Sequence, residues 1–170
     1  MNTLHDSRIR EFREADLIPV QQLIHQTIDV CYSGVYPSRA VQFFKEFYSR
    51  ENILMRHQKG EILVVEQGGN VIATGAIVGN EIFAVFVHPE FQRHGHGGAL
   101  MRELENRAKA RGCKESELSV SLPSRGFYEN LGYEILEECS IDVGKGERLD
   151  FWKARKPLTR QESKRFSNLP

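Results

Sequence analysis

The sequence predicts a mixed α/β fold in a single domain. Three observations predict it. Segments rich in β-branched and aromatic residues alternate with amphipathic helical stripes, glycine-containing turns join several strands, and one strand continues through a glycine-rich loop into a long helix. A chain of 170 residues is long enough to bury a substantial core as one unit.

The first third of the chain predicts one strand and two helices. Residues 8–12 form the strand, and 14–16 offer an N-cap to a helix. The apolar stripe of that helix recurs at helical spacing and consists of Leu17, Val20, Leu23, Ile24 and Ile28. Residues 31–37 form a loop. Ser38 then caps a second helix, whose apolar side carries Val41, Phe44, Phe47 and Tyr48.

The middle of the chain predicts a β-meander followed by a helix. Residues 62–66 and 71–78 are strands joined by a hairpin turn, and residues 81–87 form the next strand. Pro89 ends this strand because proline has no N–H to donate to a ladder. A long helix follows, and Gly112 stops it.

The remaining elements complete the sheet. Residues 118–121 are a short strand, a short helix runs from Pro123 to Tyr128, and residues 133–139 and 148–154 are two more strands. We expect one domain over residues 1–157 and a polar, frayed tail over residues 158–170.

The loop between the strand at 81–87 and the long helix predicts an anion site. Its sequence is Gln92-Arg93-His94-Gly95-His96-Gly97-Gly98. A glycine-rich loop that enters a helix leaves several N–H groups without partners, at the positive end of the helix dipole. A phosphate or pyrophosphate fits such a site.

Two common nucleotide loops do not match this segment. A P-loop requires Lys followed by Ser or Thr after its last glycine, whereas Gly98 is followed by Ala99. A Rossmann fingerprint requires a third glycine or alanine where Leu100 stands, and its strand comes first in a repeating βαβ pattern. The pattern that remains is Q/R-x-x-G-x-G/A, matched by Gln92, Gly95 and Gly97.

With this strand, loop and helix, the chain resembles the GNAT superfamily of acetyl-CoA-dependent N-acetyltransferases. A second matching element lies at residues 127–133, which resembles the family's F-Y-x-x-x-G-F/Y pattern, and the resemblance spans about residues 9–156. It implies a mostly antiparallel, partly splayed sheet of six to seven strands flanked by about four helices. It also implies acetyl-CoA as the co-substrate, with its pyrophosphate on the loop.

The resemblance assigns roles along the cofactor path. Main-chain groups of Val85, Phe86 and Val87 would pair with the pantetheine arm like an added strand, and the Val87 N–H would stabilise the oxyanion. The pyrophosphate would lie on the N–H groups from Arg93 to Gly98. Arg93 could add charge or remain a solvated surface group, and His94 and His96 are more simply exposed loop residues. Many relatives have asparagine at the position of Ser121, whose shorter hydroxyl weakens the case for a direct pantetheine contact.

Two residues would carry the proton transfers. Tyr128 matches the position of the general acid that protonates the leaving thiolate; the alternative is a buried tyrosine at a helix end. Glu81 opens the strand that leads to the loop, and could act as a base through water or be a solvated strand-end residue. His88 and Glu90 are weaker candidates for the base.

The expected reaction is direct transfer of acetyl from acetyl-CoA to a primary amine in a ternary complex. Bulky aromatic side chains near the site, Phe83, Phe86 and Phe127, favour a short acyl group. The acceptor stays open between a small-molecule amine and a protein amine; Tyr32 and Tyr36 could pack against it or belong to the core. The alternative function is a non-catalytic acyl-CoA-binding regulatory module.

Composition argues against nucleic-acid binding, membrane binding, metal sites and disulfides. The 23 basic and 23 acidic residues balance, which gives no field for nucleic acid or an anionic membrane. The three cysteines lie far apart without metal-ligand spacing, so we expect no metal, no disulfide and a cytoplasmic location. A homodimer is also expected, with residues 148–154 as the pairing strand.

Overall fold

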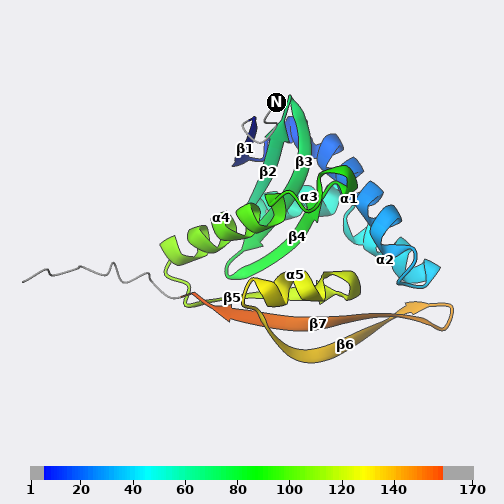
Figure 1. Cartoon of the computed structure of the whole chain (residues 1–170). Coiled ribbons are helices and arrows are strands. Elements are labelled where there is room, and N and C mark those ends of the chain that lie inside the picture. Colours follow the sequence, from blue (N-terminus) through cyan, green and yellow to red (C-terminus); the bar gives the residue numbers. More distant parts are fainter. Residues whose placement is uncertain (1–5, 159–170) are drawn as a thin grey trace, which may run out of the picture.

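The computed structural model describes residues 6–158, and over this range the chain forms one sheet of seven strands with five α-helices packed on it (Figure 1). The strands are β1 (Ser7–Glu11), β2 (Glu61–Gln67), β3 (Asn70–Val78), β4 (Glu81–Val87), β5 (Glu115–Ser121), β6 (Glu134–Gly144) and β7 (Glu147–Pro157). The helices are α1 (Leu17–Tyr32), α2 (Ser38–Phe47), α3 (Arg50–Lys59), α4 (His96–Ala110) and α5 (Arg125–Asn130). The mixed α/β class predicted from the sequence is confirmed.

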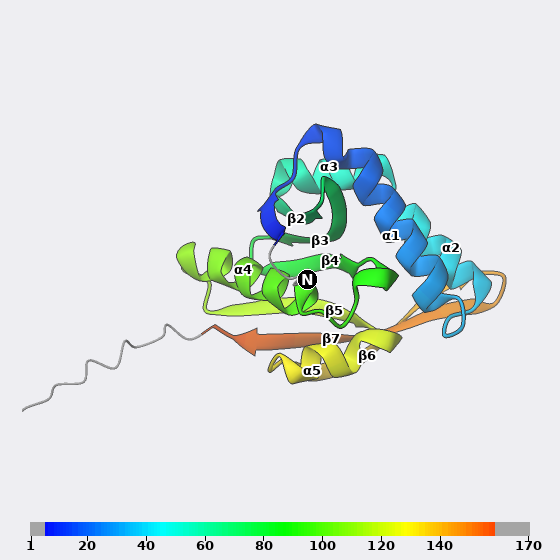
Figure 2. The same cartoon turned by 45° about the horizontal axis from the view of Figure 1, so that its top comes forward.

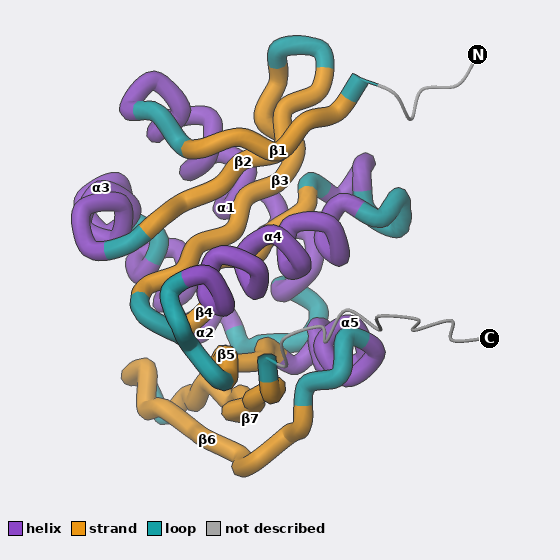
Figure 3. The backbone as a smooth tube through the Cα atoms, turned by 90° about the vertical axis from the view of Figure 1, so that its left-hand side faces the viewer, coloured by secondary structure: helices purple, strands orange, loops and turns teal. Residues whose placement is uncertain are grey.

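The sheet has the order β1-β2-β3-β4-β5-β7-β6 and consists of two halves. Every neighbouring pair is antiparallel except β4 and β5, which run parallel and share a single register pair, Glu81 with Glu117. Figure 3 shows β1 to β3 in one half and β5 to β7 in the other, with α4 between them. The predicted splay of the sheet is therefore present between β4 and β5.

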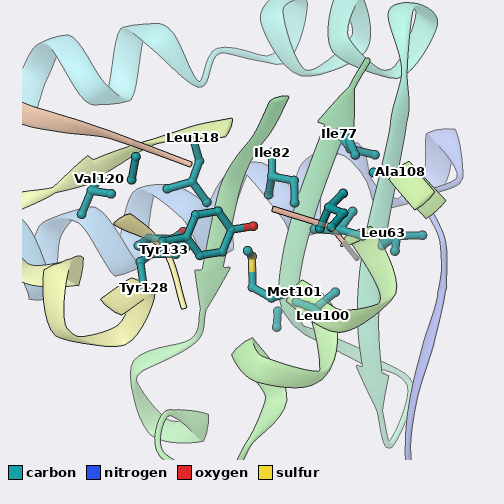
Figure 4. Packing of buried hydrophobic residues seen from close by; sticks show 14 of the residues in the cluster. Leu63, Ile77, Ile82, Leu100, Met101, Ala108, Leu118, Val120, Tyr128 and Tyr133 are labelled. Carbon is teal, nitrogen blue, oxygen red and sulfur yellow. The ribbon is translucent and has the colours of Figure 1, made fainter. Parts of the chain in front are cut away.

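Helices cover both faces of the sheet. Helices α1, α2 and α3 lie on one face, while α4 and α5 lie on the other (Figure 2). Two buried clusters correspond to these faces. The cluster under α4 continues from Leu63 and Ile77 to Leu118, Val120 and Tyr128, so both halves of the sheet share one core on this side (Figure 4).

Helix α3 is absent from the sequence prediction, which left residues 50–59 without an element. Ile53 is its one buried residue, so the helix has almost no apolar stripe for periodicity to detect. Its ends do carry signals. The Ser49 hydroxyl accepts a hydrogen bond from the Asn52 N–H, and basic residues fill the last turn before Gly60.

The two helix starts differ from the prediction. Asp16 stands at the N-cap of α1, but its carboxylate caps no α1 N–H; it accepts hydrogen bonds from Arg10 and from the Arg13 N–H instead. Ser38 is the first residue of α2 rather than its cap. A carboxylate oxygen of Glu147, from β7, accepts the Arg39 N–H at 2.7 Å and so joins this helix to the C-terminal half.

The C-terminal hairpin is longer than predicted and changes the expected dimer geometry. Strand β7 pairs with β6 along most of its length and with β5 from Phe151 to Pro157, so within the expected pairing strand only residues 148–150 lack a neighbour on the β5 side. The edge on this side is β6. The homodimer itself stays a prediction, and most of the expected tail lies outside the described residues.

The structure also describes the state of the cysteines and allows a search for metal ligands and membrane-spanning helices. Cys31, Cys113 and Cys139 are free thiols. Within residues 6–158, no three His, Cys, Asp or Glu side chains gather in a way that could hold a metal ion. No helix there has both the length and the hydropathy needed to span a bilayer.

Candidate active site

A bulge in β4 creates the gap between the two halves of the sheet. The register with β3 passes from Phe86 opposite Thr74 to Phe83 opposite Ala76, so Ala84 and Val85 together face Gly75. Ala84 has a φ of 55°, in the left-handed region that residues with a side chain seldom adopt. A bulge bends its strand and increases the local twist, which accounts for the departure of β4 from β5.

The end of β4 presents main-chain groups to this gap. The His88 N–H donates to the Ile72 carbonyl of β3 at 2.8 Å. Because successive N–H groups of a strand point to opposite edges, the Val87 N–H faces the gap, while the main chain of Phe86 faces β3. Of these two residues, it is Val87 whose N–H is available to a ligand between β4 and β5.

The glycine-rich loop ends in an exposed helix N-terminus. Arg93 and Gly95 have φ values of 62° and 86°, and Gly95 is the N-cap of α4. The first hydrogen bond of the helix runs from the Ala99 N–H to the Gly95 carbonyl at 3.1 Å. The N–H groups of residues 96–98 precede it and have no partner within the helix. Residues 91–98 include no acidic side chain, so the loop suits a pyrophosphate.

Gly97 is required by packing rather than by its backbone conformation. A Cβ at this position would lie 3.1 Å from Cζ of Phe127 and 3.5 Å from a methyl group of Val87. By contrast, a Cβ at Gly98 would meet only the Arg102 side chain, at 3.7 Å. The absence of a side chain at Gly97 therefore allows α4 to approach α5 and the end of β4.

The other polar side chains of the loop have separate positions. The Gln92 amide donates to the Val87 carbonyl at 3.0 Å, so it turns inward to β4. Arg93 and His94 are exposed, and the rings of His94 and His96 lie 6.5 Å apart. Partial burial, together with the nearby His94, lowers the pKa of His96. Arg93 is thus open to an incoming anion.

Tyr128 reaches the gap from α5. Its ring is buried in the core beside Tyr133 (Figure 4). Its side chain also lines a cavity where the two halves separate. Its hydroxyl forms no hydrogen bond with any of residues 6–158. Burial, and then the neighbouring Tyr32, Tyr48 and Tyr133, raise the pKa of Tyr128 above its ordinary value of 10.0. The phenol therefore keeps its proton at neutral pH and is free to donate it.

Ser121 ends β5 at the same cavity. Its hydroxyl accepts a hydrogen bond from Tyr32 at 3.1 Å and lies 2.6 Å from the Ser124 hydroxyl. These two partners already use much of its capacity. Ser121 thus joins α1 to the C-terminal half.

The cavity has a volume of about 460 Å³ and lies between β4 and the C-terminal strands, on the face covered by α1 to α3. Val85 and Phe86 line it, together with Ser121 and Tyr128. Aromatic side chains form the rest of the α2 side: Phe43, Phe44, Phe47 and Tyr48. The cavity thus extends from the proposed acid to an aromatic wall.

The outer part of the cavity contains charged residues. Glu81 is exposed and lines it. Arg56 and Lys59 line the same region from α3. Sequence reasoning missed Arg56 because it lies on the helix that periodicity did not detect. The signals that remain are the Ser49 cap and the cluster of cations before Gly60.

The two tyrosines considered for acceptor binding lie in different places. Tyr32 lines the cavity. Tyr36 does not; its hydroxyl donates to the Asp150 carbonyl and accepts the Leu122 N–H, so it joins the loop after α1 to β7. Of the bulky aromatics, Phe83 and Phe86 line the cavity, whereas Phe127 lies over Gly97.

Comparison with known proteins assigns this mixed α/β fold to a family. Residues 22–133 match the family model described as Acetyltransferase (GNAT) family. The match spans more than half of the chain, so the protein belongs to the GNAT acetyltransferase family.

Solved structures share the whole fold. A GCN5-related N-acetyltransferase from Rhodopseudomonas palustris, titled "Aminotransferase, Class-II", has a TM-score of 0.83 at 19% identity, over 93% of this chain and 99% of that one. The PaiA N-acetyltransferase from Thermoplasma acidophilum, in complex with coenzyme A, has a TM-score of 0.72 at 22% identity, over 89% and 98%. The putative acetyltransferase yncA from Salmonella typhimurium, with acetyl-CoA, has a TM-score of 0.64 at 17% identity, over 94% and 98%.

Proposed function

We propose that this protein transfers the acetyl group of acetyl-CoA to a primary amine by direct transfer in a ternary complex. The observation that carries this proposal is the Tyr128 hydroxyl, which lines the gap beside β4, keeps its proton at neutral pH and has no hydrogen-bond partner among residues 6–158. A purely structural buried hydroxyl is normally hydrogen-bonded. The solved neighbours that hold coenzyme A and acetyl-CoA support the choice of donor.

The donor would bind mainly to main-chain atoms. The N–H groups of residues 96–98 would hold the pyrophosphate, with Arg93 adding charge, and the gap beside β4 would take the pantetheine arm. The Val87 N–H would stabilise negative charge that develops on the thioester oxygen, a contribution of about 3 kcal/mol for a single donor. Gln92 acts as a positioning residue, because it binds the Val87 carbonyl.

The proton transfers complete the reaction. The neutral amine attacks the thioester carbon, the C–S bond breaks, and Tyr128 donates its proton to the departing sulfur. Glu81 receives the proton that the amine loses, through water, and the phenolate is reprotonated from solvent. No covalent acetyl-enzyme is needed, and no cysteine lines the cavity among the described residues.

The test measures thiol release from acetyl-CoA with a pooled panel of amines, for the wild type and a Tyr128→Phe variant. We expect amine-dependent release, with kcat at least a hundredfold lower in the variant and the KM for acetyl-CoA changed by less than about threefold. Tyr133→Phe is the matched control, because its hydroxyl bonds Ser116 and Glu105 in the core rather than facing the cavity. Its kcat should fall less than threefold.

Two results would contradict the proposal. If acetyl-CoA raises the melting temperature by mass action but no amine in the panel causes thiol release, the protein does not acetylate these amines, and either the acceptor lies outside the panel or the chain is a non-catalytic acyl-CoA-binding module. If Tyr128→Phe retains full kcat, Tyr128 is not the acid.

A further inference from the structure

Arg56 occupies an unusual place in the cavity wall. It lies in the last turn of α3, and three aromatic rings surround its guanidinium: Cζ lies 4.3 Å from the Phe47 ring centre and 5.2 Å from those of Tyr48 and Phe83. All four side chains line the cavity. One of its N–H groups donates to the Phe47 carbonyl at 3.2 Å. A guanidinium has five N–H donors, so most of its donors stay free.

No carboxylate forms an ion pair with this guanidinium within the described part of the chain, although Glu81, which lines the same region of the cavity, attracts it from beyond ion-pair distance. Arg10, Arg107 and Arg125 each form an ion pair, whereas no Asp or Glu oxygen of residues 6–158 lies within 4.0 Å of an Arg56 nitrogen. Burial lowers the pKa of Arg56, although the guanidinium remains charged at neutral pH. A half-buried cation without a direct ion pair is incompletely compensated, and an anionic group on a ligand would supply a direct partner.

Aromatic side chains lie between Arg56 and the Tyr128 end of the cavity. The Tyr48 ring next to Arg56 lies 5.2 Å from the Phe86 ring, which lies 6.3 Å from Tyr32. Tyr32 in turn bonds Ser121, which lines the cavity with Tyr128. A molecule that reaches from Tyr128 to Arg56 therefore passes an aromatic surface.

We propose that the acceptor is a small amine with an apolar middle and a carboxylate at its far end, and that Arg56 binds this carboxylate and determines specificity. The inference rests on the proposed acetyl transfer. A single planar guanidinium matches a monoanionic carboxylate by two parallel hydrogen bonds. The cavity of about 460 Å³ must also take the acetyl end of the donor, which restricts the acceptor to a small molecule.

The test compares two probes that differ only at the far end, 4-(2-aminoethyl)benzoate and its methyl ester. Binding of each to coenzyme A-saturated protein is measured by titration calorimetry. We expect wild type to bind the carboxylate at least tenfold more tightly than the ester. Arg56→Gln removes the charge and should lower carboxylate affinity to that of the ester, while the affinity for the ester changes by less than twofold.

Two further variants separate charge from packing. Arg56→Lys keeps the charge but loses the planar fork, and should retain part of the preference. Arg50→Gln is the matched control on the same helix, because Arg50 is exposed and bonds Gln21 at 2.8 Å outside the cavity. It should leave the preference unchanged. Melting temperatures are measured for each variant, and if Arg56→Gln does not fold, the wild type and Arg56→Lys decide the outcome.

The inference and the proposed function fail in different ways. Equal binding of the two probes by wild type, or an undiminished preference in Arg56→Gln, overturns the carboxylate site whatever the activity. Thiol release with both probes at equal kcat/KM leaves the acetyl transfer standing and overturns the specificity. If the protein binds the carboxylate probe selectively but releases no thiol with it, the carboxylate site at Arg56 is supported. Acetyl transfer to this amine is then contradicted.

Discussion

The side-chain amide of Gln92 donates a hydrogen bond to the main-chain carbonyl of Val87 across 3.0 Å, and so fixes the beginning of the glycine-rich loop to the end of β4. The loop provides the candidate pyrophosphate site, and Val87 provides the candidate oxyanion donor. One side chain therefore sets the position of the candidate pyrophosphate site relative to the candidate oxyanion donor.

Gln92→Ala should affect both catalysis and binding. Loss of one hydrogen bond of about 1 kcal/mol releases the end of β4, so we expect kcat to fall about five- to tenfold and the KM for acetyl-CoA to rise. Arg93→Ala provides the contrast, since Arg93 is exposed and would act on the anion alone. Its defect should lie in KM and weaken with added salt. Identical kinetic defects in both variants would argue against a positioning role for Gln92.

The pH dependence of the reaction should lack an alkaline decline attributable to Tyr128. The raised pKa of Tyr128 means that its phenol keeps its proton to a higher pH than the ordinary value of 10.0. We therefore expect kcat/KM for the acceptor to rise with pH as the amine loses its proton, and to show no fall up to pH ~10. A rate profile from pH 6 to 10 measures this. A decline with a midpoint near 9 would mean that Tyr128 is less shielded than its burial indicates.

Gly97→Ala should destabilise the protein through Phe127. Alanine is the better helix former by about 1 kcal/mol, but here its Cβ would press on the Phe127 ring at 3.1 Å. We expect a net loss of about 1 kcal/mol in the free energy of unfolding. Urea titrations of the single variants and of Gly97→Ala/Phe127→Ala complete a double-mutant cycle. The loss should disappear in the Phe127→Ala background, and Gly98→Ala should be neutral or stabilising.

Asp16→Asn should lower stability at neutral pH. The Asp16 side chain is 9% exposed and accepts hydrogen bonds from both terminal nitrogens of Arg10, at 2.7 and 2.9 Å, and from the Arg13 N–H. Hydrogen bonds to charged groups contribute about 1.5–3 kcal/mol each, so we expect a loss of about 2–3 kcal/mol. The matched control is Glu11→Gln, whose ion pair with Arg107 is exposed and should contribute less than about 1 kcal/mol.

This stabilisation should depend on pH in one direction. Arg10, and then the Arg13 N–H, hold the pKa of Asp16 below its ordinary value of 3.8, against the opposing effect of burial. A lowered folded-state pKa gives stability that is complete above the unfolded-state value and is lost as pH falls through the folded-state value. Unfolding at pH 7 and pH 3 should therefore show the wild type and Asp16→Asn converging in acid. A constant difference would show that the charge of Asp16 is not responsible.

The parts of the fold that the sequence predicts are those with local signals. The path from β4 through the loop to α4 combines a β-branched strand, a proline stop, glycines and a helical stripe, so its elements and order are predictable. β5 begins earlier than expected because its first inward position is Ser116, a polar residue whose burial depends on the distant Tyr133 hydroxyl. The position of Arg56 likewise depends on how α3 packs against the sheet.

The candidate site also contains parts that local sequence signals predict and parts that depend on distant contacts. Tyr128 and the loop lie in short motifs, and Val87 follows from its place before Pro89. The bulge at Ala84, the role of Gln92 and the aromatic surroundings of Arg56 involve contacts between segments far apart in the chain. No local pattern encodes them.

The two sides of the cavity differ in how mutation can change them. The donor contacts proposed at Val87 and the start of α4 use backbone atoms that almost every amino acid possesses, so single replacements there can preserve the chemistry. The opposite wall consists of side chains, and each replacement on α2 or α3 alters its shape or charge directly. Gene duplicates of such an enzyme can therefore acquire new acceptors while they inherit an unchanged acetyl donor.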